Sequence, residues 1–266
     1  MAEMKDPGGL PPKTKKGIKH IIAVGSGKGG VGKSTLSALL AVALAKEGLK
    51  VGILDADVTG PSIPKLLGVR EKPFVTDKGV IPPKSSWLGI KVMSVNLVLD
   101  DPSKPVVWRG PLIGKAIMQF WEDINWEDTE YLVVDLPPGT ADAVLTVMQL
   151  IDLDGVVMVS TPQGLSSLIV EKMMHMAKML EVPLIGIVEN MGYAVCPHCG
   201  ERWDLYGPSH IDQLKERWEV PILAGLPVDR EISILSDSGR LEHYTDDAVL
   251  KKLADGVLSA LNKTVA

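Results

Sequence analysis

The residues Gly27 to Thr35 read GKGGVGKST and combine glycine, lysine and hydroxyl side chains at a spacing that suits a polyphosphate. Glycines there can adopt positive φ and let backbone N–H groups approach phosphate oxygens without a Cβ clash. Lys33 would reach the β- and γ-phosphates, the Ser34 hydroxyl would coordinate Mg²⁺, and Thr35 would hydrogen-bond the α-phosphate. The expected nucleotide contacts are Gly27, Lys28, Gly29, Gly30, Val31, Gly32, Lys33, Ser34 and Thr35. No guanine-recognition motif is apparent, so the pattern favours ATP.

Three aspartates follow apolar runs that predict strands. Asp55 and Asp57 end one run two residues apart, so in an extended segment they would share a face. We expect Asp57 to position or activate the attacking water, and Asp55 to hold Mg²⁺ through a water. Asp135 ends another run, in YLVVDLPPGT, and suits an indirect Mg²⁺ contact. Each of them could instead cap the helix that follows.

The chain has two cysteines, Cys196 and Cys199, in the sequence CPHC. Two thiolates at this spacing can bind one metal atom, but zinc sites and iron–sulfur clusters usually take four protein ligands. A symmetric dimer would supply four. The alternatives are a structural zinc ion, a redox disulfide, and a Cys₂His site that includes His198.

Buried strands and amphipathic helices alternate along the sequence. Strands are predicted at 20–24, 50–54, 88–95, 131–136, 155–160, 184–188 and 221–226, and helices at 33–47, 112–121, 143–150, 165–180, 211–217 and 246–261. This alternation predicts an α/β fold, with a mostly parallel central sheet and helices on both faces in three layers. Ligands then bind at the carboxyl ends of the strands, where the motifs fall.

The remaining sequence bounds the organisation of the chain. Residues 1–18 are rich in Gly, Pro and Lys and predict a flexible tail, and 19–266 predict one ATPase domain with a metal-binding loop at 192–203. The basic cluster of Lys13, Lys15, Lys16 and Lys19 is weighed as an anionic-surface contact against plain solubility. The net charge of −5 does not favour nucleic acid as a partner. No apolar run is long enough for a membrane span or a signal core, so we expect a cytoplasmic protein without a membrane partner.

The additional lysine at Lys28 resembles the deviant Walker A motif of the MinD, ParA and nitrogenase iron protein class of P-loop NTPases. The resemblance implies an ATP-dependent homodimer in which Lys28 acts in catalysis across the interface, on the partner's nucleotide. It also implies that Asn190, after the predicted strand 184–188, holds the adenine with the loop 226–229, through Pro227 and Asp229. An asparagine can offer the base both a donor and an acceptor.

The whole pattern resembles the Mrp/Nbp35 (ApbC-like) family of iron–sulfur cluster carrier ATPases. The matching segments are SGKGGVGKST at 26–35, DADVTGPS at 55–62, WRGP at 108–111, DLPPGT at 135–140, Asn190-Met191, CPHC at 196–199 and GLPVD at 225–229. The resemblance implies a [4Fe–4S] cluster bridged between two subunits through Cys196 and Cys199. ATP would control the dimer, an upstream assembly scaffold would supply the cluster, and apo-proteins would receive it.

Two other functions stay open at this stage. A positional ATPase like MinD or ParA would share the phosphate loop, but it leaves CPHC unexplained. A zinc-clamped ATPase that inserts a metal into enzymes would use both motifs, and only the metal would separate it from a cluster carrier.

Overall fold

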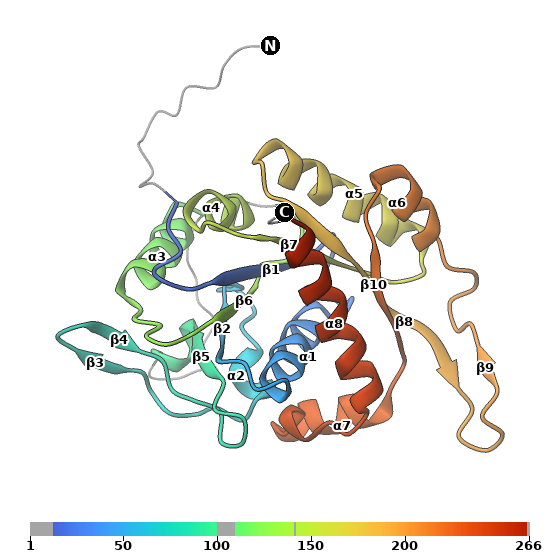
Figure 1. The fold of residues 1–266 in the computed structure, drawn as a ribbon, viewed down its shortest axis with the longest axis horizontal. Helices are drawn as coiled ribbons and strands as arrows, with labels where there is room; N and C mark the ends of the chain where they lie inside the picture. The colour runs from blue at the N-terminus through green and yellow to red at the C-terminus, as the bar shows by residue number, and fades with distance from the viewer. Residues whose placement is uncertain (1–12, 100–109, 141, 265–266) are drawn as a thin grey trace, which may run out of the picture.

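The computed structural model describes residues 13–99, 110–140 and 142–264 (Figure 1). Its strands are β1 (His20–Ser26), β2 (Val51–Asp55), β3 (Phe74–Thr76), β4 (Gly79–Ile81), β5 (Lys91–Ser94), β6 (Tyr131–Asp135), β7 (Gly155–Ser160), β8 (Leu184–Val195), β9 (Arg202–Trp203) and β10 (Ile222–Pro227). Its α-helices are α1 (Lys33–Lys46), α2 (Ile63–Leu66), α3 (Gly110–Asp123), α4 (Asp142–Leu150), α5 (Gly164–Met179), α6 (Ile211–Trp218), α7 (Arg230–Ser238) and α8 (Asp247–Thr264).

Seven strands form a parallel sheet in the order β10-β8-β7-β1-β6-β2-β5. Successive residues of a strand point to opposite faces, and β1 shows how this divides the core. Ile22 and Val24 belong to the cluster under α1, α2 and α8, whereas Ile21 and Ala23 belong to the cluster under α3, α4, α5 and α6. The expected three-layer α/β fold is confirmed.

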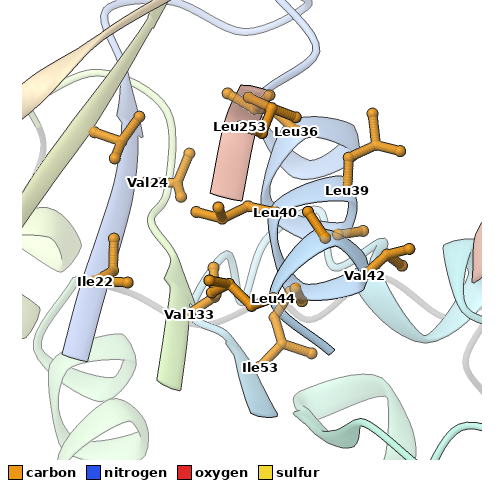
Figure 2. Packing of buried hydrophobic residues seen from close by; sticks show 14 of the residues in the cluster. Ile22, Val24, Leu36, Leu39, Leu40, Val42, Leu44, Ile53, Val133 and Leu253 are labelled. Carbon is orange, nitrogen blue, oxygen red and sulfur yellow. The ribbon is translucent and has the colours of Figure 1, made fainter. Parts of the chain in front are cut away.

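Helix α1 is central to the first cluster. Its apolar run from Leu36 to Leu44 is buried almost all round, because the sheet covers one side and α8 the other. Figure 2 shows Leu40 and Leu44 of α1 facing Val133 of β6 and Ile53 of β2. Helix α1 directly follows the phosphate loop, so its packing fixes the loop relative to the ends of β1 and β6.

Several elements differ from the sequence-based expectation. The strand expected at 184–188 extends to Val195, so Asn190 lies within β8 instead of after it. The segment 72–86 contains the hairpin of β3 and β4, while α2, β9 and α7 were not predicted. Helix α7 is short and none of its residues is fully buried, although Ile232 and Leu235 pack against the first cluster. None of the described helices combines the length and apolar character needed to cross a membrane.

Residues 13–18 pack on the domain, which corrects the expectation that the mobile tail extends to residue 18. Ile18 is buried, and the Lys15 ammonium lies 2.6 Å from the Asp154 carboxylate. Lys16 donates to main-chain carbonyls at the end of α3 and just after it, including that of Ile124 at 3.1 Å. The four lysines considered above as a contact for an anionic surface all donate hydrogen bonds within the chain. They are Lys13, Lys15, Lys16 and Lys19.

Candidate nucleotide site and cysteine pair

The phosphate loop lies between β1 and α1 and is shaped by glycine backbone conformations. Gly30 and Gly32 have φ of 81° and 82°, in the left-handed region that favours glycine. Gly32 is also the N-cap of α1 and provides no side chain to the free N–H groups of the first turn. An open helix N-terminus of this kind is suited to a phosphate.

A buried polar cluster surrounds Asp135 at the carboxyl end of β6. Lys33 Nζ donates to Asp135 Oδ1 at 2.7 Å, and the Ser34 hydroxyl donates to Asp135 Oδ2 at 2.6 Å. Ser37, one turn further along α1, donates to Oδ1 at 2.6 Å. The fold thus brings together three of the predicted residues and adds Ser37, whose spacing of four from Lys33 on a helix is the sequence signal for it. A hydroxyl beside a carboxylate is a donor set that fits Mg²⁺.

Asp55 ends β2 and pairs in register with Asp135 of the adjacent strand β6. Its Oδ2 accepts from the N–H groups of Ser62 and Ile63, at 3.0 and 3.2 Å, at the start of α2. Burial, and then the charge of Asp135, raise the pKa of Asp55 to about 8. Asp55 therefore lies beside Asp135 and also orders the loop that leads to α2.

Asp57 lies in a turn after β2, which corrects the expectation that Asp55 and Asp57 share one face of an extended segment. Its Oδ1 accepts from the Thr59 hydroxyl at 2.9 Å and from the Gly60 N–H at 3.2 Å. The Asp57 N–H donates to Asp55 Oδ1 at 3.3 Å. The Asp57 carboxylate is thus held by its own turn and is separate from the hydrogen-bond cluster around Asp135.

A cavity of about 330 Å³ adjoins the first turn of α1 and contains the residues expected to hold the base. Its lining includes Gly32, Thr35, Leu36, Leu39, Asn190, Met191, Leu226, Pro227, Val228 and Asp229, together with Ile232, Ser233, Ser236 and Asp237 of α7. Helix α7 was missed by the sequence analysis. Ser236 Oγ is buried there without a hydrogen-bond partner.

The predicted base contacts also have structural partners within the chain. Asn190 Nδ2 donates to the Val31 carbonyl at 2.9 Å and so braces the phosphate loop. Asp229 caps α7 by accepting from the Glu231 N–H, and its other oxygen accepts from the Tyr244 hydroxyl at 2.7 Å. Pro227 lines the cavity.

Lys28 bonds to a residue outside the Asp135 cluster. Its Nζ donates to Gln163 Oε1, 3.0 Å away, on the residue before α5. Gln163 was not selected from the sequence. The N–H of Gly139, in the DLPPGT segment, donates to the Ser26 carbonyl. Arg109 of the WRGP segment lies outside the described residues.

The cysteine pair lies where β8 runs beyond the sheet and turns back into β9 (Figure 1). Gly200, at φ 74°, donates its N–H to the Cys196 carbonyl and closes the turn. Hydrogen bonds from the N–H groups of Cys199 and His198 lower the pKa of the Cys196 thiol. Cys199 is exposed, and Val195 and Trp203 nearby are 49% and 52% exposed.

No cluster of three His, Cys, Asp or Glu side chains that could hold a metal forms within the described ranges. The Cys₂His site weighed for His198 therefore has no complete ligand set in one chain. The two thiols give two of the four ligands that zinc sites and iron–sulfur clusters usually take.

A family model described as ParA, NUBPL iron-transfer P-loop NTPase, matches residues 17–261. The chain belongs to this family. The iron–sulfur cluster carrier protein of Pyrococcus horikoshii is 41% identical over 265 residues, which is 96% of this chain and 89% of the relative. That of Methanocaldococcus jannaschii is 46% identical over 224 residues, or 84% and 77% of the two chains. The resemblance to iron–sulfur cluster carrier ATPases is confirmed.

Solved structures agree with this placement in the iron-transfer P-loop NTPases. A nucleotide-binding protein from Archaeoglobus fulgidus, in complex with ADP and with cobalt found in it, is 47% identical with a TM-score of 0.78. The match covers 86% of this chain and 90% of that one. The MinD protein of Pyrococcus horikoshii with Mg-ADP has a TM-score of 0.64 at 19% identity, over 92% of this chain and 98% of that chain, which shows a shared fold.

Replacement of Gly32 by alanine tests the phosphate loop. The new Cβ would lie 2.2 Å from Asn190 Nδ2 and would be held at positive φ. We expect a loss of stability of about 1–3 kcal/mol and nucleotide binding weakened by at least about tenfold. Urea unfolding and titration with a fluorescent ATP analogue measure the two effects. Gly29→Ala is the control for stability, because its Cβ meets nothing within 4 Å. Equal stability of the two variants would contradict this account.

Alkylation of the metal-free protein by iodoacetamide tests the turn around Cys196. The thiolate is the reactive form, so a lowered pKa moves the midpoint of the rate below the ordinary cysteine value, and Cys196 reacts faster than an ordinary thiol near neutral pH. Mass spectrometry of the peptides resolves Cys196 from Cys199. The same chain in urea is the control, since its N–H donors are released and the midpoint should return to the ordinary value. An unchanged midpoint on unfolding would be the contrary result.

Proposed function

We propose that this protein is an ATP-dependent iron–sulfur cluster carrier. It binds ATP with Mg²⁺ at the phosphate loop and holds a [4Fe–4S] cluster between the cysteine pairs of two copies. An upstream assembly scaffold supplies the cluster, and apo-proteins receive it. The observation that carries the proposal is the presence of CPHC in the turn that follows a projecting strand, in a P-loop NTPase whose relatives bear the name of cluster carriers.

The buried cluster around Asp135 supports the proposed nucleotide chemistry. The γ-phosphate takes the place of Asp135 as partner of Lys33, because both are anions that compete for one ammonium group. Ser34 would then be free to hold Mg²⁺, and Asp55 and Asp135 would be the carboxylates that help to hold it. Mg²⁺ neutralises charge on the phosphates when it is bound. Asp57, held separately by its turn, positions the water that attacks the γ-phosphate.

Lys28 acts across the dimer in this proposal. Its contact with Gln163 engages the ammonium outside the Asp135 cluster of its own chain, which suits a group that serves the nucleotide of a partner. In that place it stabilises charge on the transferring phosphoryl group, as an arginine finger does. Hydrolysis then removes the γ-phosphate that Lys28 contacts and weakens the dimer.

The cysteine turn supports the proposed handling of the cluster. Two thiols per chain, one of them exposed, can join with those of a second chain to give four thiolates. The exposed apolar residues beside the turn, Val195 and Trp203, provide surface that such a contact would bury. A cluster held at the tip of an arm is accessible to a recipient protein.

Metal and sulfide analysis tests the cargo. After anaerobic reconstitution we expect about two iron and two sulfide per chain, as one four-iron cluster shared by two chains requires. Cys196→Ser should lose both, and Cys196 and Cys199 are the only cysteines in the chain. Ser209→Ala, a substitution outside the cysteine turn, is the control. Zinc at about half an atom per chain without sulfide would refute the carrier function and favour a zinc-clamped ATPase.

Mixing of two inactive variants tests the role of Lys28. Lys28→Ala should bind ATP without hydrolysing it, and Lys33→Ala should bind ATP poorly. If Lys28 acts in trans, a mixture regains about a quarter of the wild-type ATPase rate, because half of the dimers carry one complete site. Phosphate release measures the ATPase rate. A mixture of Lys28→Ala with Asp57→Asn is the matched second test, and it should recover activity in the same way. Because Asp57→Asn keeps Lys33, no recovery in either mixture would mean that Lys28 serves its own subunit.

A further inference from the structure

Strand β8 is interrupted between the nucleotide site and the cysteine pair. Gly225 of β10 pairs with Glu189, and the next pair joins Pro227 to Tyr193. One residue intervenes on β10 and three intervene on β8, namely Asn190, Met191 and Gly192, which we call the β8 bulge. Met191 has φ 56°, which is uncommon for a residue with a side chain. Bulges re-aim side chains and often lie beside functional sites, and a strained backbone persists only where its surroundings hold it.

The β8 bulge contacts the phosphate loop. Asn190 donates to the Val31 carbonyl at 2.9 Å, and the Met191 Cε lies 3.8 Å from the position that a Cβ on Gly32 would occupy. Both residues also line the cavity expected to take the base. Movement of the loop on nucleotide binding therefore acts directly on the β8 bulge.

The last residue of the β8 bulge must be small. A Cβ on Gly192 would lie 2.9 Å from Glu189 Oε2. Glu189 is buried and its Oε1 accepts from the Ser209 hydroxyl, so it cannot readily yield. The bulge is thus confined between the phosphate loop on one side and a fixed carboxyl group on the other.

Beyond the bulge, β8 is anchored to the loop expected to hold the base. The Val228 N–H donates to the Tyr193 carbonyl at 2.7 Å. The Arg202 guanidinium lies 3.8 Å from the centre of the Tyr193 ring and fastens β9 to the same residue. Within the described part of the chain, the ladder of β8 then passes to β9, and Cys196 follows three residues after Tyr193. The end of β8, which leads to the cysteines, is therefore hydrogen-bonded to both loops of the nucleotide site, the phosphate loop and the loop 226–229.

We infer that the β8 bulge is a positioning element that transmits nucleotide occupancy to the cysteine pair within one chain. The inference rests on the proposed function for the identity of both sites. A nucleotide that displaces the phosphate loop or the loop 226–229 shifts a segment to which β8 is hydrogen-bonded. The end of β8 and the cysteine turn that follows it then move as well. Coupling between sites is reciprocal, so occupancy of the cysteine pair changes nucleotide affinity by the same factor.

Thiol reactivity in the metal-free, full-length protein tests this inference. The rates of alkylation of Cys196 and Cys199 by iodoacetamide are compared without nucleotide and with saturating Mg²⁺–ADP. We expect a change of about threefold or more in the wild-type protein, as a shift between two arm positions would give. The ratio of the alkylation rates with and without ADP should not depend on protein concentration. A ratio that changes with protein concentration would indicate dimer formation instead.

Two variants and one control locate the coupling. Gly192→Ala forces the β8 bulge against Glu189, and Asn190→Asp keeps the side-chain size but removes the donor to Val31. Each is measured at its own saturating ADP concentration, and each should reduce the effect of ADP to less than about 1.5-fold. Gly225→Ala is the matched control on β10, since its Cβ meets nothing within 4 Å, and it should keep the wild-type response.

The outcomes separate this inference from the proposed function. Wild-type thiols that ignore bound ADP, or an unchanged response in both variants, would overturn the coupling even if iron and sulfide bind as proposed. An ADP-dependent rate that both variants lose supports the coupling even in a protein that takes up zinc and no sulfide, in which case only the cargo is wrong.

Discussion

The burial of Asp135 is the constraint on which the site depends. Its carboxylate is completely buried, and a buried charge is tolerated only when it is paired and hydrogen-bonded. Lys33, Ser34 and Ser37 provide that pairing from the first turns of α1. The same contacts fix the helix that follows the phosphate loop to the end of β6. A ligand that takes Lys33 must therefore offer a comparable negative charge, which a nucleotide phosphate does.

The parallel sheet places the nucleotide-site residues at one edge, where the carboxyl ends of its strands lie. β1, β2 and β6 are adjacent, so the phosphate loop, Asp55 and Asp135 come together although they are far apart in the sequence. β8 lies two strands from β1, and the cavity between α1 and α7 spans that gap. Because β8 continues past the sheet, one strand serves both the nucleotide site and the cysteine arm. A carrier that must respond to nucleotide can use such a direct connection.

Much of the site could be predicted because its signals are local. The turn of GKGGVGKST, the carboxylates that end apolar runs and the spacing in CPHC each lie within a few residues, where steric rules and ligand geometry are readable. The alternation of strands and helices likewise predicted the three layers. The predictions failed where burial, rather than periodicity, decides. None of the residues of helix α7 is fully buried, β8 continues beyond its apolar run, and residues 13–18 pack although they are rich in lysine.

The sequence by itself therefore determined the class of fold, the loop that suits a phosphate and the pair of thiols. The tertiary structure decided which groups meet: Asp135 with Lys33 and Ser37, Asn190 with the Val31 carbonyl, and Asp229 with Tyr244. It also decided that Asp57 is held in its own turn, away from Asp135. The physical reason is that the phosphate loop, the strands and helices and the cysteine turn each depend on the dihedral angles of a few neighbouring residues. Contacts between distant residues depend on how all the layers pack, which local sequence does not encode.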